Sequence, residues 1–221
     1  MSDAPDNDRP AAAEPASVAA AMSEAVVASV EHPHRFEAVF DHYHRTIHEY
    51  LARAVGRDHA DEYAGDVFVA AFSGRARYDP ALGGVRAWLF GIAANIRRTR
   101  ARSHARGRQA WRRVGPERDA QDGGFEVVEE GLDYGRRLAW VTEFMRDLSE
   151  TDREVLVLYA WGELSYPEIA QALGVEIGTV RSRLARARGR LRELLAASGE
   201  VPGARGNFPD DEDGPWTSWS G

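Results

Sequence analysis

Residues 164–194 read LSYPEIAQALGVEIGTVRSRLARARGRLREL, and this stretch decides the fold of the C-terminal part of the chain. Ser165 and Glu168 have the spacing of a capping box, and the proline between them falls in the first helical turn, where its missing N–H costs nothing. Gly174 suits a left-handed turn between two helices, and the small Ala170 lets the second helix cross close to the first. The stretch therefore predicts a helix-turn-helix.

The second helix of this motif, expected over about residues 178–196, has an apolar face and a basic face. Between Thr179 and Arg192 it carries six arginines and no acidic residue, whereas a helix that is only solvated usually mixes both signs. The basic face therefore indicates a contact with nucleic acid. Six apolar residues are expected to anchor the two helices to each other: Ile169, Leu173, Val175, Val180, Leu184 and Leu191.

The first two turns of the second helix enter the major groove of DNA in this motif. Arg181 and Arg186 lie in these turns, and each can hold a guanine through two hydrogen bonds. The arginines farther round or farther along suit phosphates, which position a protein without specifying sequence: Arg183, Arg188, Arg190 and Arg192. The DNA contacts predicted for the motif are Thr179, Arg181, Ser182, Arg183, Ala185, Arg186 and Arg188.

The composition excludes several kinds of site. The chain has no cysteine, which rules out disulfides, thiolate metal ligands and cysteine nucleophiles. All 28 basic residues are arginine, whose planar fork grips phosphate or guanine. No apolar run approaches the ~20 residues of a membrane span, and the N-terminus lacks the order of a signal peptide, so we expect a cytoplasmic protein without membrane contact.

The net charge of −7 is unevenly distributed along the chain. Residues 35–113 carry 15 arginines against 8 acidic residues, and residues 136–195 carry 10 against 9, whereas the segments around them are acidic. This alternation is typical of two domains with a linker and tails. The predicted organisation is a disordered extension (1–34), a helical domain (35–113), a flexible acidic linker (114–135), a second helical domain (136–197) and a disordered acidic tail (198–221).

Helical periodicity predicts an all-α first domain, with no strand pattern. One helix covers residues 36–55, and its apolar stripe is Phe36, Val39, Phe40, Tyr43, Ile47, Tyr50 and Leu51. A second covers about residues 59–72, with inward positions at Tyr63, Val67, Ala70 and Ala71. A third begins near Val85, after a loop. In the N-terminal extension, only residues 18–30 show a marginal helical period.

Residues 97–113 hold eight arginines and no acidic residue, a density that suits a DNA backbone. Tyr78 and Trp88 precede this stretch, and their rings are able to stack on unpaired bases. The helical spacing of Trp88 with its apolar neighbours fits a core residue as well. Asn95 follows, placed either to bond a base or to cap the helix end.

The motif at residues 164–191 resembles the fourth conserved domain of bacterial RNA polymerase sigma factors of the extracytoplasmic-function (ECF) group, in the sigma-70 family. Three further phrases, FDHYHRTIHEYL, DHADEYAGDVFVAAF and RYDPALGGVRAWLFGIAANIRRTR, resemble the second domain of that family. The two resemblances cover roughly residues 36–105 and 136–195, in the order that the family has. By this resemblance the chain is identified as a sigma factor.

The resemblance implies that the chain binds core RNA polymerase and directs promoter-specific transcription initiation. The helix-turn-helix would read the −35 element as duplex. The first domain would recognise and open the −10 element, with a flipped base held at the loop 79–84. An anti-sigma factor is a usual partner in the family. The implied −10 and backbone contacts are Tyr78, Asp79, Trp88, Asn95, Arg97, Arg98, Arg100 and Arg102.

The acidic residues Asp61, Glu62 and Asp66 form a ridge that, from the residues alone, is equally well a solvated helix face. By resemblance, this ridge docks on the clamp helices of the largest polymerase subunit, and the flap of the second-largest subunit is a further contact. The family usually has a glutamine-glutamate pair where this chain has Gly65-Asp66.

Two other classes of function remain open. A stand-alone helix-turn-helix regulator would explain residues 136–195, but it would not explain the content of the first domain. For an enzyme, His44 and His48 have the one-turn spacing that can bind zinc, but the chain has no HExxH motif, Gly-rich phosphate loop or nucleophile elbow. We therefore expect no enzymatic activity, cofactor or metal.

Overall fold

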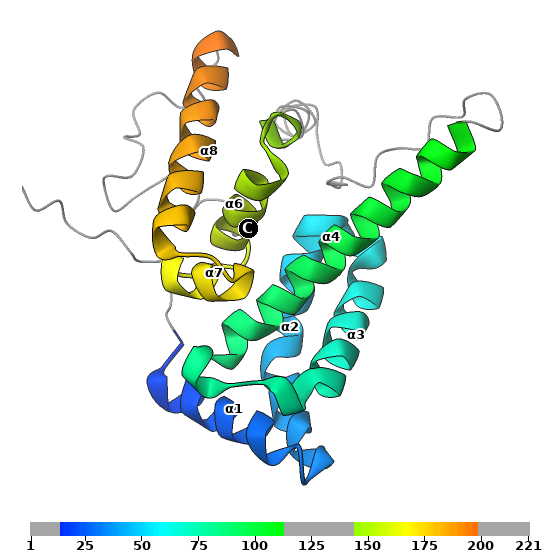
Figure 1. The fold of residues 1–221 in the computed structure, drawn as a ribbon, viewed down its shortest axis with the longest axis vertical. Helices are drawn as coiled ribbons and strands as arrows, with labels where there is room; N and C mark the ends of the chain where they lie inside the picture. Colours follow the sequence, from blue (N-terminus) through cyan, green and yellow to red (C-terminus); the bar gives the residue numbers. More distant parts are fainter. Residues whose placement is uncertain (1–13, 113–143, 199–221) are drawn as a thin grey trace, which may run out of the picture.

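The computed structural model describes residues 14–112 and 144–198, and within these ranges every regular element is a helix (Figure 1). The all-α expectation is confirmed. The predicted linker (114–135) and nearly all of the predicted tail (198–221) lie outside the described residues. None of the described helices is long and apolar enough to cross a membrane. The elements are α1 (Ala16–Ala28), η1 (Pro33–Phe36), α2 (Glu37–Val55), α3 (Arg57–Gly74), η2 (Arg75–Arg77), η3 (Pro80–Leu82), α4 (Val85–Arg112), α6 (Glu150–Ala160), α7 (Tyr166–Leu173) and α8 (Ile177–Ser198).

Helices α2 and α3 pack against each other directly after Gly56, whose positive φ of 87° lets the chain reverse without a longer loop. The apolar stripe expected for α2 is buried at Val39, Tyr43, Ile47, Tyr50 and Leu51. The expectation is wrong at two positions. Phe40 is 41% exposed, because its ring packs edge-on against Phe68 at the margin of the core. In α3, Phe68 is buried and Ala70 is exposed.

The N-terminal extension is the main correction to the sequence-based prediction. Residues 1–34 were expected to be mostly disordered, with a marginal helical period over residues 18–30, but α1 is a regular helix that lies across the ends of α2 and α4 (Figure 1). Val26 and Ser29 are completely buried, and the Nε of Arg75 donates to the Ser29 carbonyl at 3.1 Å. The helix is rich in alanine and buries few large side chains, so its periodicity is weak and its stability comes from tertiary contact.

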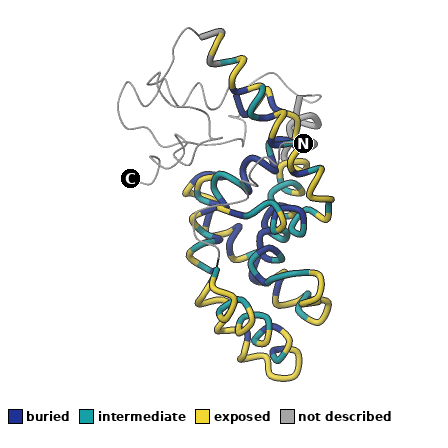
Figure 2. Tube along the Cα trace, turned by 90° about the vertical axis from the view of Figure 1, so that its left-hand side faces the viewer, coloured by how far each residue is buried: buried dark blue, intermediate teal, exposed yellow. Residues whose placement is uncertain are grey.

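Helix α4 lies at the centre of the molecule and packs on both groups of helices. On one side it meets α2 and α3, and on the other it meets α7 (Figure 1), and Figure 2 shows buried residues gathered where the helices pack together. Its residues Leu89 and Phe90 are completely buried, and the Phe90 ring lies 5.0 Å from that of Tyr50. The apolar cores of the two groups are therefore continuous through α4.

The backbones of α4 and α7 approach closely at Gly91. A Cβ at this position would lie 2.6 Å from the Ala172 carbonyl oxygen, which is shorter than any ordinary van der Waals contact. Because the obstructing atom belongs to the backbone of α7, no side-chain rotation can relieve the overlap. Helices α4 and α7 are thus as close as only a glycine permits.

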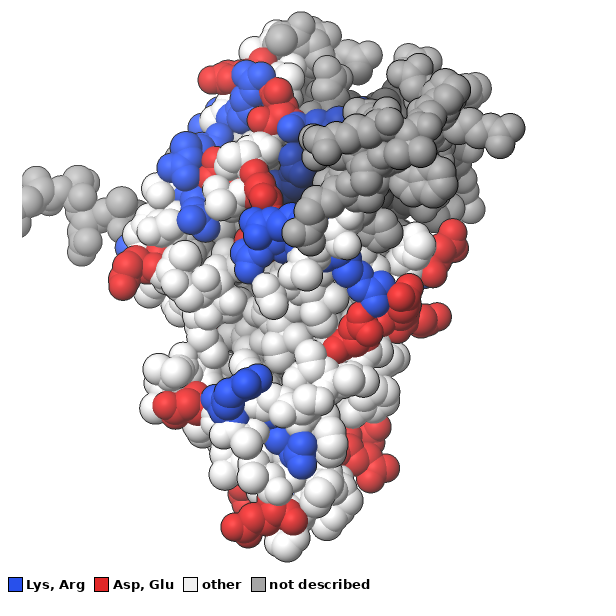
Figure 3. Space-filling view, turned by 45° about the vertical axis from the view of Figure 1, so that its right-hand side comes forward, with Lys and Arg blue, Asp and Glu red and all other residues white. Residues whose placement is uncertain are grey.

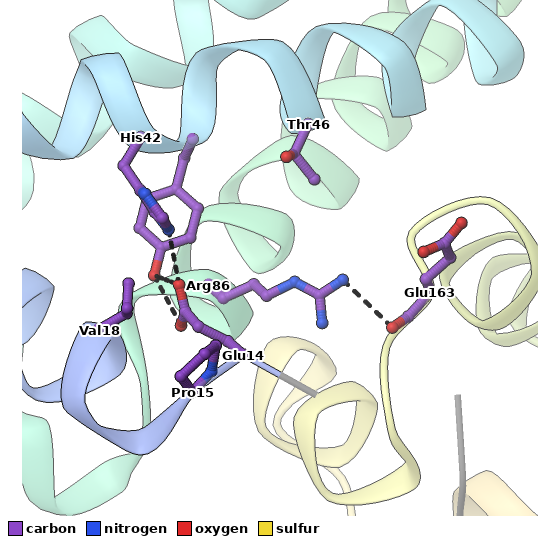
Figure 4. Close-up of a pocket in the computed structure, with 8 residues that line it drawn as sticks. Glu14, Pro15, Val18, His42, Thr46, Arg86 and Glu163 are labelled. Carbon is purple, nitrogen blue, oxygen red and sulfur yellow. Dashed lines mark hydrogen bonds and ion pairs between the residues drawn. The ribbon is translucent and has the colours of Figure 1, made fainter. Parts of the chain in front are cut away.

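Polar contacts at the start of α4 also hold the two groups of helices together. The Nη2 of Arg86 donates to the carbonyls of Gly162 (2.9 Å) and Glu163 (3.2 Å). The Nε2 of Gln171 donates to the Gly84 carbonyl at 3.2 Å. Figure 4 shows Arg86 extending from α4 toward Glu163. The Arg86 guanidinium therefore provides hydrogen-bond donors to two backbone carbonyls at the interface, those of Gly162 and Glu163.

We predict that Gly91→Ala opens the contact between α4 and α7, because the added methyl group meets the Ala172 backbone. The measurement is the radius of gyration from small-angle X-ray scattering, which should increase. The matched control is Gly65→Ala in α3, where nothing lies within 4 Å of the added Cβ. This control should raise the free energy of unfolding by up to about 1 kcal/mol and leave the radius unchanged. An unchanged radius in Gly91→Ala would contradict the close approach.

Candidate nucleic-acid interface

The helix-turn-helix begins at the capping box that the sequence predicts. The Oε2 atom of Glu168 accepts from the Ser165 N–H at 2.8 Å and from its hydroxyl at 2.7 Å, while the Ser165 Oγ accepts from the Glu168 N–H. Helix α7 ends at Gly174, which is left-handed with φ 63° and ψ 41°. The predicted capping box and the predicted left-handed turn are both confirmed, so the N-terminus and the C-terminus of α7 are determined by residues within the motif.

The apolar face of α8 packs on α6 and α7. Val180, Leu184 and Leu191 are buried as expected, and Ala187 is also completely buried. On α7, Ile169 and Ala170 are buried, and Leu173 and Val175 lie only partly buried at the edge of the core. This packing determines which face of α8 remains exposed.

The exposed face of α8 carries the residues expected to touch bases. Arg181, Ser182, Ala185 and Arg186 are all exposed, and they occupy the first turns of the helix. The Ser182 hydroxyl donates to the Thr179 carbonyl at 3.0 Å, within the helix. The structure therefore brings these residues together on one outward surface.

The arginines expected at phosphates are placed less uniformly. Arg183 and Arg188 are half-buried, and the Nη2 of Arg188 donates to the Tyr166 hydroxyl at 3.2 Å. Arg190 is exposed and pairs with Asp147 and with Glu193. These arginines therefore flank the outward surface of α8 at its edges.

Asp152, which the sequence analysis did not single out, holds Arg186. The carboxylate lies in the first turn of α6 and accepts from the Arg186 Nη2 at 2.8 Å and from its Nε at 3.2 Å. Burial raises the pKa of Asp152, but hydrogen bonds from Arg186 and Ser149 outweigh it and lower the pKa below its usual value. Asp152 and Arg186 are 34 positions apart in the chain, so no local sequence pattern predicts that they pair.

The arginines of α4 do not form an isolated basic strip. Arg100 donates to Glu62 at 2.8 Å and also pairs with Asp66, so it joins the expected DNA-binding stretch to the expected polymerase-binding ridge. Arg102 reaches Glu150 of α6 at 3.4 Å. Figure 3 shows basic and acidic side chains interspersed on one face. The third ridge residue, Asp61, lies 3.0 Å from a ring nitrogen of His48.

Arg97 and Arg98 face the second group of helices. Arg98 lies 3.5 Å from the carboxylate of Glu154, which is buried in α6. Burial raises the pKa of Glu154, and the two arginines oppose this shift. The Nε of Arg97 is buried without a hydrogen-bond partner among the described residues. In this arrangement Arg97 is directed into the interface.

The loop between α3 and α4 is built around Tyr78. Tyr78 is only 9% exposed, its ring lies 5.0 Å from that of Trp88, and its hydroxyl donates to the Gly83 carbonyl at 3.0 Å and contacts Ser23 of α1. Its buried ring therefore supports the loop and offers no open face for stacking. Trp88 is only partly buried.

Asp79 and Leu82 lie in the loop before α4, and Asn95 lies farther along the helix. Asp79 caps η3 by accepting from the Ala81 N–H at 2.9 Å, and the exposed Asn95 accepts from Arg98 at 3.1 Å. Leu82, which sequence reasoning missed, is 76% exposed at the tip of the loop. The sequence feature that could have predicted its exposure is the position of an apolar residue inside a loop of proline and glycine.

The histidines weighed as a zinc site lie one above the other on α2. The rings of His44 and His48 are stacked with centroids 6.1 Å apart. Within the described ranges, no group of three or more His, Cys, Asp or Glu residues is arranged to hold a metal ion.

Two family models match the chain. The model described as "Sigma-70 region 2" matches residues 39–107, which span most of α2, all of α3 and most of α4, and "Sigma-70, region 4" matches residues 138–191. Together the two matched regions span more than half of the chain. Helix α1 precedes both of them.

Curated relatives point the same way. The chain is 28% identical, over 165 residues, to the "ECF RNA polymerase sigma factor SigK" of Mycobacterium ulcerans, covering 74% of this chain and 87% of that protein. It is 28% identical, over 163 residues, to the "ECF RNA polymerase sigma factor RpoE" of Cereibacter sphaeroides, covering 73% of this chain and 86% of that protein.

Solved structures share the fold. One is CnrH in complex with the cytosolic domain of CnrY, with a TM-score of 0.55, 24% identity, and coverage of 80% of this chain and 98% of that chain. Another is the sigma factor RpoE in complex with the anti-sigma factor NepR from Bartonella quintana, with a TM-score of 0.53, 25% identity, and coverage of 74% and 98%.

We predict that Ser165→Ala lowers the free energy of unfolding by about 1 kcal/mol, because the first turn of α7 loses its N-cap. Urea denaturation followed by circular dichroism measures the change. Ser182→Ala is the control, since the Ser182 hydroxyl bonds only a carbonyl of its own helix and removing it should not lower stability. Equal losses in the two variants would contradict the structural role of the capping box.

Proposed function

The chain belongs to the ECF group of the sigma-70 family and directs promoter-specific transcription initiation, and from this premise we propose that its two groups of helices divide the promoter between them. Helix α8 reads the −35 element as duplex. Helix α4, with the loop before it, recognises and opens the −10 element. The observation that carries the proposal is the outward face of α8, where side chains that can read bases are exposed together.

The −35 proposal rests on the chemistry of that face. Arg181 and Arg186 can each donate two hydrogen bonds to a guanine in the major groove. Ser182 and Ala185 have small side chains that leave space for the bases between the two arginines. Arg183 and Arg188 flank this face at positions suited to phosphates. Thr179, near the start of α8, is a further phosphate contact.

The −10 proposal rests on one stripe of α4. Trp88 and Asn95 are seven residues apart and therefore share a face, which continues to Arg98 and Arg102. Tyr78 and Asp79 support the loop from inside. Arg97 and Arg100 add charge beside this stripe.

The core polymerase is the proposed partner of the ridge formed by Asp61, Glu62 and Asp66, which would dock on the clamp helices of the largest subunit. The flap of the second-largest subunit is a further proposed contact. Arg100 has to release the ridge when polymerase takes its place. RNA synthesis is the chemistry of the core enzyme, so this chain needs no catalytic group or cofactor of its own. It would act in the cytoplasm, where polymerase and DNA meet.

An anti-sigma factor is a further proposed partner. Two structures that share the fold are complexes, CnrH with the cytosolic domain of CnrY and RpoE with the anti-sigma factor NepR. A protein of that kind would have to cover the same surfaces that bind polymerase or promoter.

Run-off transcription tests the proposal. The purified full chain is added to core RNA polymerase on genomic fragments, and we expect initiation from specific start sites that core polymerase alone does not use. Tight binding of duplex DNA without any initiation would instead favour a stand-alone helix-turn-helix regulator.

We predict that Arg181→Ala and Arg102→Ala have different effects on DNA binding. Arg181→Ala should remove preference at one base pair of the −35 element, by about 1–3 kcal/mol. Arg102→Ala should weaken binding to all sequences alike and make the slope of log K against log salt shallower by about 0.9. Binding of the holoenzyme to promoter variants over a range of salt concentrations measures both, and a sequence-dependent effect of Arg102→Ala would contradict its backbone role.

A further inference from the structure

We propose that Asp152 is a positioning residue for −35 recognition, which grips one edge of the Arg186 guanidinium and presents the opposite edge to a guanine. The proposal rests on the proposed function of α8. Asp152 itself touches no DNA in this scheme and acts only through Arg186.

The geometry of the pair leaves the right donors available. A guanidinium has two edges that can each make paired hydrogen bonds, one with Nε and one Nη atom and the other with both Nη atoms. Asp152 takes the first edge, through Nε and Nη2. The second edge keeps two parallel donors, and guanine O6 and N7 require such a pair.

Burial of the two partners is strongly unequal. The side chain of Asp152 is 11% exposed, whereas that of Arg186 is 57% exposed. The carboxylate is a fixed point on the protein because its backbone N–H donates to the Ser149 Oγ at 3.1 Å and α6 packs on α8. The guanidinium therefore has one end anchored in the protein and the other open to solvent.

Anchoring matters because a long arginine side chain loses rotamer freedom when it binds a base. A partner that already orients the side chain removes part of this entropic penalty before DNA arrives. This gain in binding free energy is obtained only where the edge with both Nη atoms of Arg186 faces a base with matching acceptors. Asp152 should consequently affect base preference more than total affinity.

A second pair on the same helix provides a matched comparison. Arg190 pairs with Asp147, but here both side chains are exposed, by 43% and 41%. Arg190 lies farther along α8, at a position suited to phosphate. Asp147→Asn and Asp152→Asn each remove a carboxylate partner of an arginine on α8, so they differ in which arginine loses that partner; Arg190 keeps its pair with Glu193.

The experiment measures initiation by the reconstituted holoenzyme on promoters in which each −35 base pair is varied in turn. For Asp152→Asn we expect preference at one base pair to fall by about 3- to 10-fold, without loss of activity on the other promoters. Asp147→Asn should leave every preference unchanged. In the Arg186→Ala background, Asp152→Asn should have no further effect on base preference. In the chain that keeps Arg186, Asp152→Glu retains a carboxylate and should keep part of the preference that Asp152→Asn loses.

Several outcomes would overturn the inference and leave the proposed function standing. One is a base preference that Arg186→Ala changes and Asp152→Asn does not. Another is a loss of activity in Asp152→Asn that is equal on all promoters, which would indicate a purely structural role. A third is a preference that only Arg181→Ala changes. Failure of the unmodified chain to initiate at any promoter would instead reject the proposed function itself.

Discussion

The close approach of α4 and α7 at Gly91 is the constraint on which the arrangement of the two groups of helices depends. Helix α4 also packs on α1, α2 and α3, so a displacement at this point would be felt on every side of the helix. With α7 seated against Gly91, Arg86 comes within reach of Gly162 and Gln171 comes within reach of Gly84. The helix-turn-helix is thereby held through its first helix, and the outward face of its second helix stays exposed.

Several arginines of the described helices form ion pairs within the molecule. Arg98, Arg100, Arg102 and Arg186 each pair with a carboxylate on another helix. The carboxylates that pair with Arg100 and Arg102 are exposed and contribute little stability, so replacing them by a phosphate costs little free energy. A chain with a net charge of −7 can carry two arginine-rich surfaces because its acidic excess lies outside residues 35–113 and 136–195. A DNA phosphate has to compete with the carboxylates for Arg100 and Arg102, so correct placement of the DNA matters more than long-range attraction.

The sequence predicted best what neighbouring residues determine. The capping box at Ser165 and the left-handed turn at Gly174 are local, and both lie where they were expected. It did not predict α1, because an alanine-rich helix becomes stable only when its few large residues find a core. The burial of Tyr78, the partner of Arg186 and the role of Gly91 were also missed. Each of these depends on residues far apart in the chain, which leave no periodic signal.

The contact between α4 and α7 also determines what fraction of the protein molecules can bind a ligand on the α7-facing side of α4. A ligand that needs the α7-facing side of α4 binds only molecules in which the two helices have separated, so its apparent affinity is reduced by the fraction that is open. If closure is favoured by about 1.4 kcal/mol, roughly one molecule in ten is open. Substitutions at this contact, remote from any base or phosphate, would then set the concentration at which the protein becomes active, much as a change in its abundance would.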